Sequence, residues 1–258
     1  MSIKQLAEKD KARKLLENAR NIMVLSGAGL STEAGIPDFR SSNGLYANKF
    51  HGHSPETVLS HSFYLNQPEL FWEYLRTSLN YSGIQPDDSY RLIAQLEQEG
   101  RVQTVVTQNI DSLHLAAGSK HVIEIHGTLK RCYCEQCGQE YPYEQLVNGD
   151  ISPVCSCRGS IRPDVVLYDE DVPQIVDAVM AAETADLLLV LGTSLLVYPV
   201  ASIPRMFLER ALPVIIINRD KTPYHGAFNV LEINDALGST LKYLFPRGLT
   251  KPRGESTP

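Results

Sequence analysis

The chain has 258 residues, of which 43% are hydrophobic and 21% are charged, and its formal net charge is −6. These values are typical of a globular protein with one large α/β domain, or a large domain with a smaller insert, and they argue against intrinsic disorder. The negative charge argues against a nucleic-acid-binding face, and the lack of an apolar run near 20 residues or of a signal-peptide core predicts a cytoplasmic protein without a membrane span.

The first predicted elements are an amphipathic helix within residues 1–20 and a strand over Ile22–Ser26. The strand runs into Gly27-Ala28-Gly29-Leu30-Ser31-Thr32. Gly27 permits a tight turn, and we expect Gly29 to let the backbone approach a pyrophosphate. Thr32 stands at the third glycine position of the usual dinucleotide fingerprint, so the motif also fits an ordinary strand-to-helix turn and argues against an ordinary dehydrogenase.

A loop follows this turn, because Gly35 and Pro37 cannot continue a helix. It places Asp38, Phe39 and Arg40 close to the presumed phosphates. We interpret it as a candidate lid over the site. The alternative is a surface loop anchored by a buried phenylalanine.

Polar residues follow two of the next predicted strands. After an aromatic helix over Glu69–Leu79 and a helix over Asp87–Glu99, a strand over Val102–Thr107 ends in Gln108, Asn109 and Asp111. A strand over Val122–Ile125 ends in His126. A histidine at a strand end can act as a general base near neutral pH, or can simply make a structural hydrogen bond.

All five cysteines fall between residues 132 and 157. Cys134 and Cys137 form a CxxC pair followed by a glycine, and Cys155 and Cys157 form a CxC pair. Four thiolates at this spacing predict a closed, structural zinc site, with a redox CxxC as the rival interpretation. We expect the fifth cysteine, Cys132, to be a free thiol.

The rest of the chain continues an alternation of strands and helices. Strand-like apolar runs suit a parallel sheet covered on both faces, and we predict a doubly wound, Rossmann-like α/β fold with helices on both faces plus a small zinc-binding and helical lobe. Thr193, Ser194 and Asn218 follow two of these strands, so one ligand is expected across the crest of the sheet. The predicted strands here are Val165–Tyr168, Leu187–Leu191, Val214–Ile217 and Val230–Ile233, and the helices are Val172–Glu183 and Pro199–Arg210.

The expected domain organisation assigns residues 1–40, 86–129 and 163–247 to the Rossmann-like domain. Residues 41–85 form the helical part of the small lobe and residues 130–162 the zinc module. Residues 248–258 are a tail rich in Pro, Gly and charged residues.

Several of these motifs together resemble the sirtuin family, over roughly residues 5–245. The resemblance rests on long motifs in the right order. They are GAGLS at 27–31, GIPDFR at 35–40, TQNID at 107–111, HG at 126–127, the four cysteines, RPDVV at 162–166, GTS at 192–194, and Asn218.

The resemblance implies NAD-dependent removal of acyl groups from lysine side chains, with nicotinamide and O-acyl-ADP-ribose as products. His126 would be the general base on a ribose hydroxyl. NAD is then a consumed co-substrate, the zinc is structural, and the partners are acylated-lysine proteins or peptides. By position, Asn109 and Asp111 would join His126 as catalytic residues. The NAD site would comprise Gly27, Ala28, Gly29, Thr32, Asp38, Phe39, Arg40, Gln108, Ile110, Thr193, Ser194, Asn218 and Ala236.

The chain also departs from the family pattern at several positions. Asp169 stands where the family often has glycine, which would alter the peptide groove. Tyr90 stands where the family often has histidine, which we expect to affect packing only. No Tyr-x-x-Arg pair follows the aromatic helix, so an acetyl or other uncharged acyl group is favoured.

Three functions remain open on the sequence alone. A deacylase releases nicotinamide only with acyl-lysine present, whereas an ADP-ribosyltransferase or NAD hydrolase cleaves NAD without it. A non-catalytic NAD-binding or zinc-ribbon module binds without turnover, and the presence of His126 and Asn109 argues against it. We expect a monomer.

Overall fold

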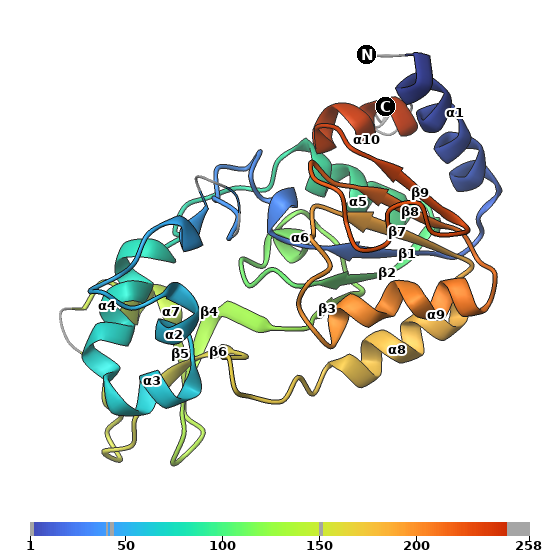
Figure 1. The fold of residues 1–258 in the computed structure, drawn as a ribbon. Helices are drawn as coiled ribbons and strands as arrows, with labels where there is room; N and C mark the ends of the chain where they lie inside the picture. The colour runs from blue at the N-terminus through green and yellow to red at the C-terminus, as the bar shows by residue number, and fades with distance from the viewer. Residues whose placement is uncertain (1–2, 40, 42–43, 150–151, 247–258) are drawn as a thin grey trace, which may run out of the picture.

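The computed structural model describes residues 3–39, 41, 44–149 and 152–246. Arg40 and the predicted tail at 248–258 lie outside these described residues, as does residue 247. The described chain forms a large lobe built on a sheet, shown at the right of Figure 1, and a smaller lobe of short helices and strands at the left. No helix in the described ranges is long and apolar enough to cross a membrane.

The large lobe contains a six-stranded parallel sheet, as predicted. Its strand order is β3-β2-β1-β7-β8-β9. Counted along the chain, this is the 3-2-1-4-5-6 order of a Rossmann fold, in which the direction of strand addition reverses between β1 and β7 and ligands bind beyond the carboxyl ends at that point. The strands are β1 (Ile22–Ser26), β2 (Val102–Thr107), β3 (Val122–Glu124), β7 (Leu187–Leu191), β8 (Val214–Ile217) and β9 (Val230–Ile233).

Successive side chains of the central strands enter two different cores. Ile22 and Val24 of β1 pack with one set of helices, while Met23 and Leu25 pack with the other, because side chains alternate across a strand. One face is covered by α1 (Ile3–Asn18), α5 (Asp88–Gln98) and α10 (Leu237–Leu244), and the other by α8 (Ile175–Thr184) and α9 (Ile203–Glu209) (Figure 1). The apolar runs of the sequence are therefore buried on both sides, as predicted.

Local signals set the limits of α5, the helix that faces the site. Asp87 caps its start by accepting hydrogen bonds from the backbone amides of Ser89 and Tyr90. Gly100 follows its end with φ +73°, a left-handed conformation that glycine adopts without steric cost. The observed helix, Asp88–Gln98, matches the predicted one within one residue at each end.

The smaller lobe has a core of its own, rich in aromatic residues that include Phe71 and Trp72. Its three-stranded antiparallel sheet has the order β5-β4-β6. The elements are α2 (Pro55–Val58), α3 (His61–Asn66), α4 (Pro68–Ser78), α7 (Tyr143–Val147), β4 (Gly127–Cys134), β5 (Glu140–Pro142) and β6 (Ile161–Val165). Short pieces elsewhere are α6 (Leu113–Ala116) and the 3₁₀ turns η1 (Ala28–Leu30), η2 (Leu45–Ala47) and η3 (Val200–Ser202).

One predicted strand was wrong. The run at Val165–Tyr168 does not join the parallel sheet. The strand in this region is β6, which pairs antiparallel with β4 in the small lobe. Residues 166–168 follow it as a connection, with the Val166 amide bonded to the His126 carbonyl. The predicted residue limits of the domains stay a prediction.

Candidate active site and zinc centre

A cavity of about 750 Å³ lies at the carboxyl ends of the parallel strands. This volume falls within the about 300–1,000 Å³ usual for small-molecule sites. Loops after β1, β2, β3, β7 and β8 line one side, and the small lobe lines the other. Of the predicted site residues, those lining the cavity are Gly27, Ala28, Gly29, Thr32, Asp38, Phe39, Gln108, Asn109, Ile110, His126, Thr193, Ser194, Asn218 and Ala236.

The glycines after β1 are constrained by contacts within the protein, and the expected approach of Gly29 to a pyrophosphate stays a prediction. A Cβ at Gly29 would lie 2.8 Å from the Cα of Gly192, and one at Gly27 would lie 2.7 Å from the Cβ of Thr193. The amide of Gly29 donates to the Gly192 carbonyl at 2.8 Å. The loops after β1 and β7 touch each other, so only small residues fit at these positions. The two glycines thereby let these loops form one side of the cavity.

A side-chain bridge ties the loops after β2 and β7 together. The amide nitrogen of Gln108 donates to the hydroxyl of Thr193 at 2.8 Å. These loops flank the loop after β1 on either side. The crest of the sheet is thus a connected polar surface rather than a set of independent loops.

His126 presents one ring nitrogen to the cavity in a defined protonation state. Its Nδ1 lies 3.0 Å from the carbonyl oxygen of Gln108, and because a carbonyl can only accept, Nδ1 carries the hydrogen. Burial lowers the pKa of His126, against a smaller opposite effect of that hydrogen bond. The ring is therefore neutral at pH 7 with a free lone pair on Nε2, which is the state that a general base requires.

Asn109, in the loop after β2, is buried and lies at the centre of a polar network. Its Nδ2 donates to the Ser31 hydroxyl at 3.0 Å and to the Tyr90 hydroxyl at 3.1 Å. Its Oδ1 is buried and has no hydrogen-bond partner among the described residues. A buried acceptor left without a donor at the edge of a cavity fits a ligand that brings a hydroxyl.

Asp111 is not among the described residues that line the cavity. Its carboxylate accepts from the Ser31 hydroxyl at 2.7 Å and from the Leu113 amide at 2.9 Å. Burial raises its pKa, although these hydrogen bonds act in the opposite direction. Asp111 thus holds the Ser31 hydroxyl by a hydrogen bond on the side away from the cavity. Its assignment as a catalytic residue stays a prediction.

The small lobe supplies an apolar side of the cavity that sequence analysis did not identify. Leu59, Leu75, Leu79 and Leu129 line it. Leu75 and Leu79 follow each other at helical spacing, which is a signal for a buried face. The spacing alone does not distinguish a face buried in a core from one that lines a cavity.

Two tyrosine hydroxyls also meet at this side of the cavity. Tyr46 and Tyr168 are joined by a 2.7 Å hydrogen bond, and the ring of Phe39 packs edge-on against Tyr46 at 5.3 Å. Phe39 thus connects the candidate lid to the small lobe. Asp169, at the position where sirtuins often have glycine, adopts the left-handed conformation with φ +73°.

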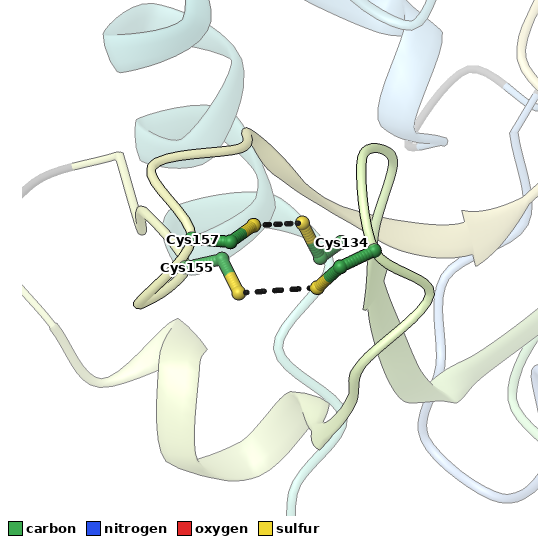
Figure 2. A group of neighbouring side chains, drawn as sticks. Cys134, Cys155 and Cys157 are labelled. Atoms are coloured by element: carbon green, nitrogen blue, oxygen red, sulfur yellow. Dashed lines mark hydrogen bonds between the residues drawn. The ribbon is translucent and has the colours of Figure 1, made fainter.

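The four cysteines of the two predicted pairs come together. Their Sγ atoms all lie within 4.8 Å of one another, with 3.5 Å between Cys134 and Cys157 and 3.6 Å between Cys137 and Cys155. A tetrahedral zinc ion with bonds of about 2.3 Å needs sulfur atoms about 3.8 Å apart. Figure 2 shows the thiols facing one another from two loops, so the residues fit a zinc ion with four protein ligands.

The shorter CxC pair forms a turn equivalent to that of the CxxC pair. The Gly138 amide donates to the Cys134 carbonyl at 2.9 Å, and the Arg158 amide donates to the Cys155 carbonyl at 2.8 Å. Both closing residues have positive φ, +72° for Gly138 and +70° for Arg158. Arg158, in the left-handed conformation, therefore closes the second turn one residue earlier than Gly138 closes the first. The CxC pair, one residue shorter than CxxC, can still supply two sulfur ligands to a four-sulfur site.

The fifth cysteine lies outside this cluster. Cys132 is fully buried in the core of the small lobe, and burial raises the pKa of its thiol to about 12. A thiol with such a pKa is protonated at pH 7, so it is a poor nucleophile, and Cys132 is not among the four clustered thiols. This agrees with the expected free thiol.

Comparisons with known proteins agree with this geometry. The Sir2 family model matches residues 27–199. An NAD-dependent protein deacetylase of Cutibacterium acnes is 44% identical over 229 residues, covering 88% of this chain and 93% of that protein. One of Clostridium acetobutylicum is 40% identical over 235 residues, covering 89% of this chain and 95% of that protein.

Solved structures of Sir2 proteins have the same fold. A histidine-to-alanine variant of Sir2 with a deacetylated p53 peptide and 3′-O-acetyl ADP ribose superposes with a TM-score of 0.86 at 31% identity, over 93% of this chain and 99% of that one. A Sir2 complex with a p53 peptide and NAD⁺ gives a TM-score of 0.81 at 31% identity, over 96% of this chain and 99% of that one. The family model matches more than half of this chain, and the chain covers nearly all of two relatives that are at least 40% identical to it. This chain belongs to the Sir2 family.

Proposed function

We propose that this chain removes acyl groups, acetyl in the first instance, from lysine side chains of proteins, with NAD as the consumed co-substrate. The products are the free lysine, nicotinamide and O-acyl-ADP-ribose. The observation that carries the proposal is the neutral His126 ring. Gln108 holds its Nδ1, and the ring lies in the same cavity as Asn109 and the glycine loop.

The relatives support the chemistry. The curated relatives are NAD-dependent protein deacetylases. One solved Sir2 structure holds a deacetylated peptide with an acetyl ADP ribose, another holds a peptide with NAD⁺, and a third holds a propionylated peptide. A cavity with one polar and one apolar side suits two such substrates bound together.

The residues around the cavity have different roles in binding and catalysis. The loops after β1, β7 and β8 bind the phosphates and adenosine of NAD, and Gln108 and Asn109 hold its sugars. When bound, NAD would supply its ribose C1′ to the acyl oxygen of the substrate lysine, which would form the new bond there as nicotinamide leaves. Nε2 of His126 then takes the proton from a ribose hydroxyl, which makes that oxygen a nucleophile toward the acyl carbon. Phe39 shields the sugar from water.

The apolar side of the cavity favours an uncharged acyl group. In the described part of the small lobe, the residues that line the cavity include Leu75, Leu79 and Leu129 and no lysine or arginine. A succinyl-type carboxylate would lie there without a cationic partner, at a cost of several kcal/mol. Acetyl-lysine is therefore the first substrate to test.

The pH dependence should report the histidine. Burial places the pKa of His126 below the usual value of about 6.5. The neutral ring is the active form, so kcat/KM should stay level near pH 7 and fall as the pH drops through that lowered pKa. Measuring kcat/KM for the acetyl peptide from pH 5 to pH 8 tests this. An acid limb centred above pH 6.5 would contradict the assignment.

A single assay separates the three functions that the sequence leaves open. Nicotinamide release is measured with NAD alone, with NAD and an acetyl-lysine peptide, and with NAD and the same peptide carrying unmodified lysine. The proposal expects release only with the acetylated peptide. Release with NAD alone would indicate hydrolysis or ADP-ribosyl transfer, and binding without release would indicate a non-catalytic module.

The remaining expectations are part of the same proposal. The partners are acylated-lysine proteins or peptides, and their extended backbone lies along Val165–Tyr168 and Leu195–Tyr198, most of which line the cavity. The protein acts as a monomer in the cytoplasm, without direct nucleic-acid binding. The four cysteines hold a structural zinc ion, because they leave no coordination position open and do not line the cavity.

A further inference from the structure

We propose that Tyr90 is a positioning residue, whose hydroxyl fixes the orientation of the Asn109 amide so that Oδ1 is presented to a hydroxyl of bound NAD. The inference rests on the proposed function, because it places NAD in the cavity. The sequence predicts that tyrosine at this position affects packing only. Its two hydrogen bonds, to Ser31 and Asn109, correct that expectation.

Tyr90 is held rigidly below the crest of the sheet. It lies on α5 with no exposed surface, and its ring packs edge-on against the ring of His114, with centroids 4.6 Å apart. Its hydroxyl lies 2.8 Å from Oγ of Ser31 and 3.1 Å from Nδ2 of Asn109. Burial raises the pKa of Tyr90 far above its usual value, so the hydroxyl stays protonated.

The directions of these hydrogen bonds follow from counting hydrogens. The single hydroxyl hydrogen of Ser31 goes to the carboxylate of Asp111 at 2.7 Å, because an ionised carboxylate only accepts. In the 2.8 Å contact between Tyr90 and Ser31, Tyr90 is therefore the donor, and the same hydroxyl also interacts with the carboxylate of Asp111. Its own oxygen accepts from Asn109, and the second hydrogen of the same amide nitrogen goes to Ser31 at 3.0 Å.

This network determines which end of the Asn109 amide faces inward. Both hydrogens of Nδ2 are used by Tyr90 and Ser31, so Oδ1 is the end left without a partner in the described structure. A flipped amide would lose both bonds and would leave Tyr90 as the one side-chain donor to Ser31 among the described residues. Oδ1 of Asn109 can then accept a hydrogen bond from a hydroxyl, which the ribose of NAD supplies.

Removing the Tyr90 hydroxyl should therefore weaken the preference for one amide orientation. In Tyr90→Phe the amide nitrogen keeps only its hydrogen bond to Ser31, so the observed orientation is favoured by one hydrogen bond instead of two. We expect kcat/KM for NAD to fall about tenfold, which corresponds to the loss of roughly one hydrogen bond.

The matched control is Tyr74→Phe. The Tyr74 hydroxyl is also buried but has no partner among the described residues, and its ring packs edge-on against Phe50. This control should keep kcat/KM within about twofold of the parent. Both variants should retain the circular dichroism spectrum of the parent.

A double-mutant cycle separates positioning from packing. NAD affinity is measured by calorimetry for the parent, Tyr90→Phe, Asn109→Ala and the double variant. If Tyr90 acts through Asn109, Tyr90→Phe weakens NAD binding in the parent but has no further effect in the Asn109→Ala background. An equal loss in both backgrounds, or no loss in either, would overturn the proposal.

The result is independent of whether the proposed reaction occurs. If the parent binds NAD without turning it over, the deacylase proposal fails while the calorimetric cycle still decides the role of Tyr90. If the parent deacylates peptides and Tyr90→Phe matches it in kcat/KM and affinity, the deacylase proposal stands and the positioning role falls.

Discussion

His126→Ala is expected to lower the rate of peptide deacylation by about 10²–10⁴-fold, the range that a positioned general base contributes. The ring is held at Nδ1 by the Gln108 carbonyl, so Nε2 is the only nitrogen free to take a proton. No other histidine of the described chain lines the cavity. The measurement is steady-state turnover of an acetyl-lysine peptide with saturating NAD.

The same variant should separate the two halves of the reaction. Because the base acts after nicotinamide has left, exchange of labelled nicotinamide into NAD should persist while deacylation is lost. A matched control is His121→Ala, since His121 is exposed and pairs with Glu97 away from the cavity. The control should keep turnover within about twofold. Unchanged turnover of His126→Ala would refute the assigned role.

The second large effect concerns the zinc centre. Cys134→Ser should abolish stoichiometric zinc binding, because one of four tetrahedral ligands is lost. In isolated zinc fingers, metal binding contributes on the order of 10 kcal/mol to folding. The small lobe has a core separate from the two cores of the sheet. We therefore expect it to unfold first, at a lower temperature than the Rossmann-like part.

Cys132→Ala provides the control for this experiment. Cys132 lies on the same strand, β4, two residues before Cys134, but outside the thiol cluster. It should retain one zinc per chain and lose only about 1 kcal/mol from the removed sulfur atom. Metal content by mass spectrometry and thermal unfolding measure both effects. Full zinc content in Cys134→Ser would show that the cluster is not the metal site.

Much of the sheet could be predicted because its strands carry their own signal. Ile22–Ser26, Leu187–Leu191 and Val214–Ile217 are apolar runs buried on both faces. Such a run is buried whatever its neighbours are, so its limits appear in the sequence. The structure places these strands at the predicted residues.

The strand at Ile161–Val165 could not be found in this way. It contains Arg162, Pro163 and Asp164, and it is held by pairing with β4 and by the ion pair of buried Arg162 with Glu170. Both partners lie outside the strand, so no pattern within the strand encodes them. The apolar residues that follow it therefore give the stronger strand signal, and the prediction falls on them instead.

The site shows the same division between local and distant signals. The family motifs and the ends of predicted strands indicated His126, Asn109 and Thr193, because parallel strands bring their carboxyl ends to one edge. The contact between Tyr90 and Asn109, the position of Asp111 behind Ser31, and the loop contact that requires Gly29 all depend on packing between elements. Sequence periodicity does not reveal such contacts.

The most direct test of the account is the mass of the product made from NAD and an acetyl-lysine peptide. The proposed chemistry transfers the acetyl group to ADP-ribose, so each deacetylated peptide should be matched by one nicotinamide and one O-acetyl-ADP-ribose. Free acetate with intact NAD, or ADP-ribose attached to the peptide, would contradict it.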